Sequence, residues 1–275
     1  MPNLQLDWQQ GAALAAVLAA SAVLACRTGT RRSARLAPYL REAAIIAALY
    51  SLWQLAAAVS VFGTHGAFDR AHWLVRVQRR LGLPDEQTMQ GLIIHHPLIE
   101  QACNLYYASM HFGALGIFLA WLFIRHRDRY PMVRAVLILL TAICLLVQLI
   151  PVAPPRLLPD LGFVDTAARY GQSVYQISGI TVDSLSAMPS VHVGWALLVA
   201  WAVISVSTSR YRWWVLAHPI VTVFVVVATA NHFWADGIVA ALLLVLSILV
   251  VQAGYRVIRR SSVLVSEQIV EPAYR

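Results

Sequence analysis

Long apolar passages alternate with short polar breaks along this chain. Four passages cover about residues 6–26, 43–62, 102–124 and 133–150, and three more begin near residues 189, 213 and 233. A helix of about 20 apolar residues is long enough to cross the hydrocarbon core of a bilayer. The pattern therefore predicts an all-α integral membrane protein with about seven transmembrane helices.

One segment of mixed polarity, about residues 63–101, interrupts this pattern. Within it, Leu74, Val77 and Leu81 repeat at helical spacing, and the arginines among them fall on another face. Such an amphipathic stretch is typical of a helix lying in the membrane interface. Asp85 can cap a second short helix that follows. We interpret the basic face as solvated or in contact with lipid head groups rather than as a substrate site.

Composition supports the membrane class. Of the 275 residues, 59% are hydrophobic and 12% are charged, and the mean hydropathy is +0.65. A soluble protein carries roughly twice that share of charge. The net charge of +8 could point to nucleic acid, but no basic stripe interleaves with aromatic residues. Composition therefore excludes nucleic acid as a partner and indicates membrane lipids instead.

The positions of the arginines predict the orientation of the chain. All 21 basic residues are arginine, and fifteen of them fall within residues 27–41, 125–134, 210–212 and 256–275. Short loops rich in arginine mark the cytoplasmic side of a membrane protein. We therefore expect a multi-pass protein of the cell membrane with its N-terminus outside.

The first apolar passage could be a signal peptide, because small residues lie near its end. Its first residues, however, include Asp7, no arginine precedes it, and the positive charges begin only at Arg27. A signal peptide has the opposite arrangement, so we favour a retained helix. We expect residues 1–260 to form one transmembrane catalytic domain and residues 261–275 to form a mobile cytoplasmic tail.

The sequence PVAPPRL ends the fourth passage, because proline lacks a backbone donor and clashes with a continuing helix. An external loop of about residues 151–188 follows, which is too long for a simple connector. Loops of this kind on a rigid bundle often carry function. We interpret Asp165 and Asp183 within it as solvated, with contact to a polyol head group as the alternative.

Polar residues border three apolar passages at one predicted face. Arg156 follows the fourth passage, His192 begins the fifth, and His232 and Asp236 begin the seventh. The two histidines are 40 residues apart, which is enough chain to cross the bilayer, turn and cross back. Imidazoles at a membrane boundary cost free energy unless they are paired or solvated. We therefore predict a single site at the extracytoplasmic face.

The residue types at this site suit phosphoryl transfer. Asp236 lies four residues after His232, so its carboxylate can hold one ring nitrogen and leave the other free to attack. His192 can protonate the leaving oxygen. Arg156 offers a forked donor for phosphate, and the helix start at Ser190 offers free N–H groups for an anion.

Three further polar residues share one face of the predicted third span. Asn104, Tyr107 and His111 lie at i, i+3 and i+7, so they should face the bundle interior rather than lipid. Two interpretations stay open. These side chains either bond neighbouring helices or line the substrate site.

A metal site is the competing chemistry, because two histidines and a carboxylate can bind zinc. No HExxH motif and no cysteine set is present, and the nearby Arg156 would repel a cation. The three cysteines are odd in number and lie in or beside apolar passages, which fits packing. We expect no metal and no cofactor.

The three motifs resemble those of the type-2 phosphatidic-acid-phosphatase superfamily, and within it the branch of the inositol phosphorylceramide synthases. The similar stretches are APPR at residues 153–156, AMPSVH at 187–192 and TANHFWAD at 229–236, in that order and spacing. The resemblance covers the second half of the chain, and the first two apolar passages are not diagnostic.

This resemblance implies a six-helix phosphatase-like core and a defined division of labour. It implies a phosphohistidine on His232 that is oriented by Asp236, with His192 as general acid. It also implies that Arg156 binds phosphate and that no metal takes part.

Two positions depart from the superfamily's motifs. The second motif is usually PSGH, whereas Val191 replaces the glycine here. The third motif usually has an arginine six residues before its histidine, and that position is Val226. Arg169 of the external loop is a candidate to supply the missing charge. The synthase branch also lacks that arginine, which favours transfer to an alcohol over hydrolysis.

We therefore expect a membrane enzyme that acts on a lipid phosphate or phospholipid donor and transfers phosphoinositol or a similar head group to an alcohol. A lipid phosphate phosphatase, with water as acceptor, is the alternative. A non-catalytic lipid-binding or transport protein is less favoured, because the polar residues cluster at one face and no internal repeat is evident.

Overall fold

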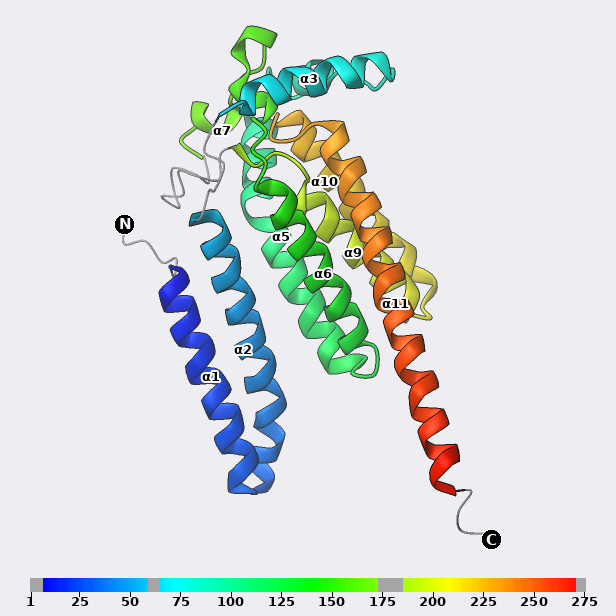
Figure 1. Ribbon diagram of the computed structural model, residues 1–275. Coiled ribbons are helices and arrows are strands. Elements are labelled where there is room, and N and C mark those ends of the chain that lie inside the picture. The colour runs from blue at the N-terminus through cyan, green and yellow to red at the C-terminus, as the bar shows by residue number, and fades with distance from the viewer. Residues whose placement is uncertain (1–6, 59–64, 173–184, 271–275) are drawn as a thin grey trace. The chain divides into compact units, whose positions relative to one another are not determined.

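The computed structural model describes residues 7–58, 65–172 and 185–270, with side chains described up to residue 258 and not for Trp53 or residues 56–58. These residues form helices and contain no β-strand, only an isolated bridge between Val152 and Ser186 (Figure 1). The chain divides into two compact units, one of residues 1–65 with 174–185 and one of residues 66–173 with 186–275.

The first unit is a helical hairpin of α1 (Trp8–Thr28) and α2 (Arg31–Ala58). Asp7 and Gln10 form a capping box at the start of α1, and Gly29 ends it with a positive φ of 65°. The helices approach closely because small residues lie between them, and Ser51 donates a hydrogen bond to the carbonyl of Trp8. The hairpin falls on the first two predicted spans, of which residues 59–62 lie outside the described residues.

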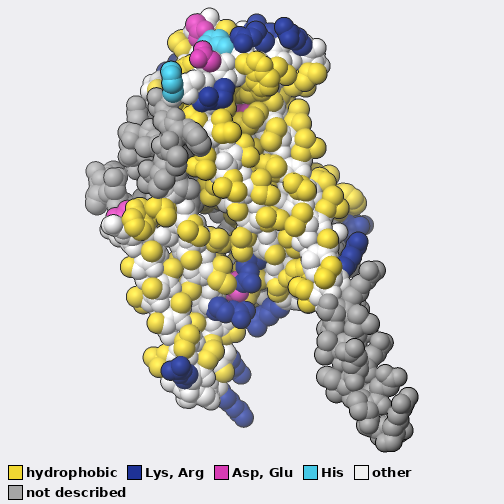
Figure 2. Space-filling view, in the orientation of Figure 1, with side chains coloured by type: hydrophobic (Ala, Val, Ile, Leu, Met, Phe, Trp, Pro, Cys, Tyr) yellow, Lys and Arg dark blue, Asp and Glu magenta, His cyan; other side chains and the backbone are white. Residues whose placement is uncertain are grey.

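The second unit contains a bundle of α5 (Pro97–Arg125), α6 (Tyr130–Gln148), α9 (Val191–Val206), α10 (Ala217–Ala228) and α11 (Trp234–Val270). Its core is built from apolar side chains on four of these helices. They include Phe118 and Leu122 of α5, Val136 and Leu140 of α6, Trp195 and Leu198 of α9, and Leu244 of α11. Figure 2 shows that apolar side chains also cover the outer surface of α5, α6 and α11, as expected for helices facing lipid.

Five described helical segments have the length and hydropathy of a membrane span. They are α1, α5, α6, residues 210–228 and α11 as far as Ile258. The predicted fifth span, α9, is apolar but has only 16 residues. The predicted second span, α2, falls outside this group because its N-terminal half carries the charged residues. The multi-pass membrane character is confirmed, and the count of seven stays a prediction.

The predicted interfacial helix is α3 (Ala67–Arg80). Leu74 of its predicted apolar face is buried together with Ala67 and Ala71, whereas Leu81 lies just beyond the end of the helix and is 71% exposed. Small residues let α3 approach the bundle closely, and the carbonyl of Ala67 accepts a hydrogen bond from the N–H of Ala153. Arg76, Arg79 and Arg80 are exposed, and dark blue side chains gather over α3 in Figure 2.

An exposed ion pair ties α3 to the external loop. His72 Nε2 lies 2.7 Å from Asp160 Oδ2. This hydrogen bond raises the pKa of His72 above its ordinary value and lowers the pKa of Asp160. Each partner therefore favours the charged form of the other, although solvent weakens the pair.

Two side chains outside the bundle cap the start of α11. Gln78 Oε1 accepts a hydrogen bond from the N–H of Ala235 at 2.8 Å, and Glu86 Oε1 accepts one from the N–H of Trp234 at 3.3 Å. Glu86 begins α4 (Glu86–Gly91), the predicted second short helix, although the Asp85 side chain makes no capping bond. The first N–H groups of α11 are thereby satisfied by protein rather than left for a ligand.

The C-terminal segment continues the last span as helix. α11 extends to Val270, so most of the predicted tail from residue 261 is helical. No proline or glycine occurs between Tyr255 and Val270 that would end it earlier. Residues 271–275 lie outside the described residues.

We predict a pH-dependent stability from Glu86, which is 4% exposed. Burial raises the pKa of this carboxyl above 4.5, so the fold favours the protonated form. The protonated Glu86 carboxyl contributes fully to the stability of the fold below its pKa in the unfolded chain. This contribution is lost as the pH rises through its raised pKa in the folded protein. Glu86→Gln keeps the acceptor for Trp234 and removes the ionisation, so it should raise the Tm at pH 8 by roughly 2–4 °C and leave it unchanged at pH 4.

Thermal unfolding in detergent at both pH values measures this effect. The exposed neighbour Asp85, changed to Asn, is the matched control and should shift the Tm at neither pH. If Glu86→Gln lowered the Tm equally at both pH values, Glu86 would act only through packing.

Candidate active site

Three backbone hydrogen bonds bring the predicted clusters to one end of the bundle. The N–H of Ser190 donates to the carbonyl of Asp236 at 3.2 Å, which joins the starts of α9 and α11. The N–H of Arg156 donates to the carbonyl of Ala230 at 2.8 Å, and that of Ala187 donates to Val152 at 3.1 Å. The ends of α6 and α10 therefore meet the starts of α9 and α11, as the sequence predicted.

The two predicted catalytic histidines lie side by side. The ring centroids of His192 and His232 are 5.6 Å apart. Tyr107 of α5 stacks on His192 with centroids 4.3 Å apart and planes 18° apart, and His111, one turn later, lies 4.2 Å from the same ring. Of the three polar residues on α5, Tyr107 and His111 thus surround His192. This clamp holds the imidazole in one place.

His232 is held at one ring nitrogen, as predicted, but the nearer partner is a backbone carbonyl and not Asp236. His232 precedes α11 and therefore does not share a helix face with Asp236. Its Nδ1 lies 2.8 Å from the carbonyl oxygen of Ala187 and 3.4 Å from Asp236 Oδ2. Because a carbonyl only accepts, Nδ1 carries the hydrogen and Nε2 keeps the lone pair. Asp236 Oδ2 also accepts from the N–H of Phe233 at 2.8 Å, so it fixes the turn as well as the ring.

The turn that carries His232 is strained and tightly bonded. Ala230 has φ 53°, in the left-handed region that non-glycine residues rarely adopt. The carbonyl of Val226 accepts the N–H groups of both Asn231 and His232, at 3.0 and 3.1 Å. Asn231 Nδ2 donates to Thr229 Oγ1 at 2.9 Å. Such strain persists only where the surroundings fix the backbone, and it often marks a functional site.

Four buried polar atoms in this cluster have no hydrogen-bond partner among the described residues. They are Nδ1 of His111, Nε2 of His192, Nε2 of His232 and Oδ1 of Asp236. A buried polar atom without a partner costs about 1–3 kcal/mol. Their concentration at one place indicates groups that are kept available for a ligand.

Arg156 is held beside this turn. Arg156 lies in a short 3₁₀ helix, Pro155–Leu157, and only 6% of its surface is exposed. Its Nη1 donates to Asn231 Oδ1 at 2.8 Å, and its Nε lies 3.5 Å from Asp165 Oδ2. Since Asn231 is the residue before His232, the guanidinium and the imidazole belong to one constellation.

The start of α9 differs from the predicted anion site. Ser190 is the N-cap residue, and its Oγ accepts a hydrogen bond from the N–H of Val193 at 3.3 Å. Pro189 therefore lies before the cap and not in the first helical turn. The Ser190 hydroxyl still has its own hydrogen to donate, so its role toward phosphate stays a prediction.

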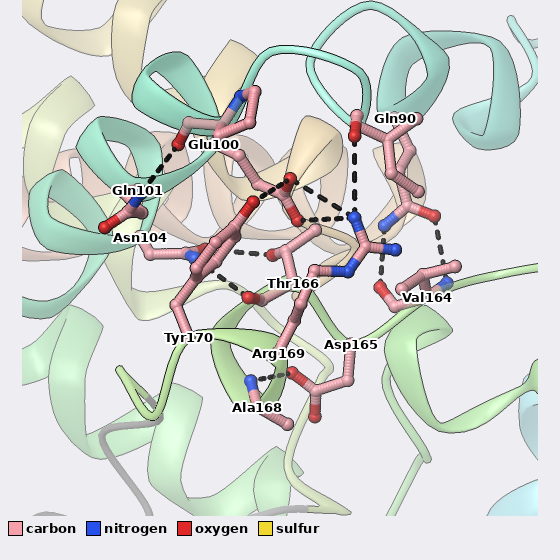
Figure 3. A network of polar contacts seen from close by, with 12 residues as sticks. Gln90, Glu100, Gln101, Asn104, Val164, Asp165, Thr166, Ala168, Arg169 and Tyr170 are labelled. Carbon is pink, nitrogen blue, oxygen red and sulfur yellow. Dashed lines mark hydrogen bonds and ion pairs between the residues drawn. The ribbon is translucent and has the colours of Figure 1, made fainter.

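A polar network holds the external loop against α5, as Figure 3 shows. Asn104 receives the hydroxyl of Thr166 on its Oδ1 at 2.9 Å and donates from Nδ2 to the Thr166 carbonyl at 3.1 Å. Arg169 Nη1 lies 3.3 Å from the carboxylate of Glu100, which is fully buried, and the Tyr170 hydroxyl donates to the same group at 3.2 Å. Asn104 and Arg169 are therefore engaged in fixing the loop.

Several partners of the site carried no signal in the sequence. The carbonyl of Ala187 is a backbone group that every residue has. Glu100 and Asp165 looked like ordinary loop or helix-end acids, and Asp183 lies outside the described residues. Asn231 could have been found, because it directly precedes His232 within the third motif.

No group of three His, Cys, Asp or Glu side chains among the described residues is arranged to hold a metal ion. The polar groups gathered at the site are imidazoles, a carboxylate and a guanidinium.

The chain was compared with known families and proteins. A family model described as the PAP2 superfamily matches residues 72–250, which is more than half of the chain. This range contains α3 from His72 onward, the external loop and the five bundle helices as far as Val250. No curated protein and no solved structure matches the chain significantly.

We predict that Arg169 stabilises the fold by neutralising Glu100. Arg169→Met would leave a fully buried carboxylate with the Tyr170 hydroxyl as its remaining described partner. We expect a loss of about 1–3 kcal/mol, below the usual cost of breaking a buried pair because the Arg169 side chain is 40% exposed. Thermal or denaturant unfolding in detergent measures it.

The double variant Glu100→Gln/Arg169→Met should recover most of this loss, because it removes both charges. Arg79→Met, on the exposed face of α3, is the control. If the double variant were as unstable as the single one, the charge of Glu100 would not be the cause.

Proposed function

The chain belongs to the PAP2 superfamily, whose members are phosphoesterases, and we propose that it transfers a phosphate-linked head group from a membrane lipid through a covalent intermediate on His232. The observation that carries this proposal is the buried Nε2 of His232. It has no partner among the described residues, while Nδ1 is held by the Ala187 carbonyl beside Asp236. A ring fixed on one side with a lone pair on the other is an activated nucleophile.

In the proposed first step, His232 Nε2 attacks the phosphorus of the donor. The N–P bond forms, the P–O bond to the lipid breaks, and His192 gives its proton to the leaving oxygen. Arg156 binds the non-bridging oxygens, where charge builds up. The Asp236 carboxylate stabilises the positive charge that develops on the His232 ring.

In the second step the acceptor restores the enzyme. His192 takes the proton of the acceptor hydroxyl, the new O–P bond forms, and the N–P bond to His232 breaks. An alcohol acceptor gives a new phosphodiester, and water gives hydrolysis. Val226, at the position where the superfamily usually has a second arginine, supports the alcohol, since the synthase branch that the motifs resemble shares this change. A lipid phosphate phosphatase is the second candidate.

We place the site at the extracytoplasmic face of the cell membrane. Arginines gather at the opposite end of the bundle, among them Arg125 and Arg134 around the start of α6 and Arg210 and Arg212 before α10. Arginine in short loops favours the cytoplasmic side. That distribution supports an active site that faces outward, toward lipids of the outer leaflet.

The covalent step is tested by trapping. Purified protein incubated with a phospholipid labelled at phosphorus should acquire label that is labile to acid and stable to base, because phosphohistidine has an N–P bond. Label should be absent from His232→Ala and present in His95→Ala, an exposed histidine outside the cluster. Labelling that persists in His232→Ala would refute the assignment.

The fate of the head group is tested by product analysis. Mass spectrometry should detect a new phosphodiester only when inositol or another alcohol acceptor is supplied with the phospholipid. This product should disappear in His232→Ala. If the products were the same with and without the alcohol, water would be the acceptor and the phosphatase candidate would hold.

A further inference from the structure

The external loop holds a carboxylate against the arginine that is proposed to bind phosphate. Asp165 Oδ2 lies 3.5 Å from Arg156 Nε, and the side chains are 26% and 4% exposed, respectively. The proposed reaction gives Asp165 no task. An arginine reserved for phosphate would bind it more tightly without an anion at its side.

The backbone on both sides of Asp165 is fastened to helices. Before it, the side-chain amide of Gln90 bonds both the N–H and the carbonyl of Val164, at 3.0 and 2.8 Å. After it, the fully buried Thr166 is bonded to Asn104 (Figure 3). These bonds keep the carboxylate beside Arg156, so a bound phosphate must share the guanidinium with it.

The negative charge of the donor phosphate then determines how tightly it binds beside Arg156 and Asp165. A phosphodiester carries one negative charge, whereas a phosphomonoester carries close to two near neutral pH, since its second pKa is about 6. The position that could have supplied a second positive charge is Val226, which is 2% exposed. Like charges a few ångströms apart in a partly buried site repel strongly, and Asp165 therefore opposes the second charge.

We propose that Asp165 is a specificity-determining residue that favours lipid phosphodiesters over lipid phosphomonoesters as donors. This inference rests on the proposed phosphoester transfer and adds the charge class of the donor. The same carboxylate can accept a hydrogen bond from a head-group hydroxyl, which a phosphodiester head group can carry and a bare phosphate monoester lacks.

The variant Asp165→Asn removes the negative charge beside Arg156. Asparagine caps a helix as well as aspartate, so its amide oxygen retains the hydrogen bond from the Ala168 N–H that starts α7 (Thr166–Arg169), and its amide nitrogen replaces the oxygen that faces Arg156. The kcat/KM for phosphatidic acid, divided by that for phosphatidylinositol in the same micelles at pH 8, should rise about tenfold. Asp160→Asn, on the same loop but paired with His72, should leave the ratio unchanged.

A binding measurement separates this inference from the proposed function. The dissociation constant of inorganic phosphate at pH 8 should fall about tenfold in Asp165→Asn, whether or not the protein turns over. Wild-type protein that transforms neither lipid would remove the proposed function and leave this binding test standing. An unchanged ratio, or unchanged phosphate binding with an unchanged Tm, would overturn the role of Asp165.

Discussion

The structure depends on one constraint, which is that the polar groups buried at the end of the bundle that carries the candidate site are removed from water and must find partners within the protein. At this end the breaks between helices expose backbone groups of α9, α10 and α11. The chain answers with bonds between distant segments, such as Arg156 to Ala230 and Ser190 to Asp236. These bonds place the histidines, so the active-site geometry is a consequence of satisfying the backbone.

The same constraint explains why the atoms left without partners are informative. The cap of α11 is complete, because Gln78, Glu86 and Asp236 accept the N–H groups of residues 233–235. Six buried side-chain atoms within the described residues are nevertheless without a partner, and four of them belong to His111, His192, His232 and Asp236 at the candidate site. A protein that tolerates this cost beside a strained Ala230 has a use for those atoms.

The sequence was sufficient for the parts of the site that periodicity controls. The 40 residues between His192 and His232 correctly predicted that the two imidazoles lie at the same end of the bundle, because two spans joined by a short turn return the chain to its starting side. For α3 the sequence correctly separated Leu74 from the exposed arginines, but it missed that Ala67 and Ala71 are fully buried beside it. Hydrophobic spacing showed that a face exists, but close contact with the loop backbone favoured the smallest side chains.

Tertiary pairing lay beyond the sequence for a different reason. Two ion pairs, Glu100 with Arg169 and Arg156 with Asp165, join segments that are far apart in the sequence. Their contact depends on how the external loop folds. The sequence made Arg169 a candidate for the missing phosphate ligand. In the structure it pairs instead with the fully buried carboxylate of Glu100, one helix turn before Asn104. The cluster around His232 therefore has Arg156 as its contacting cation among the described residues, already shared with Asp165. A site with that little positive charge is better suited to stabilising one negative charge on phosphorus than two.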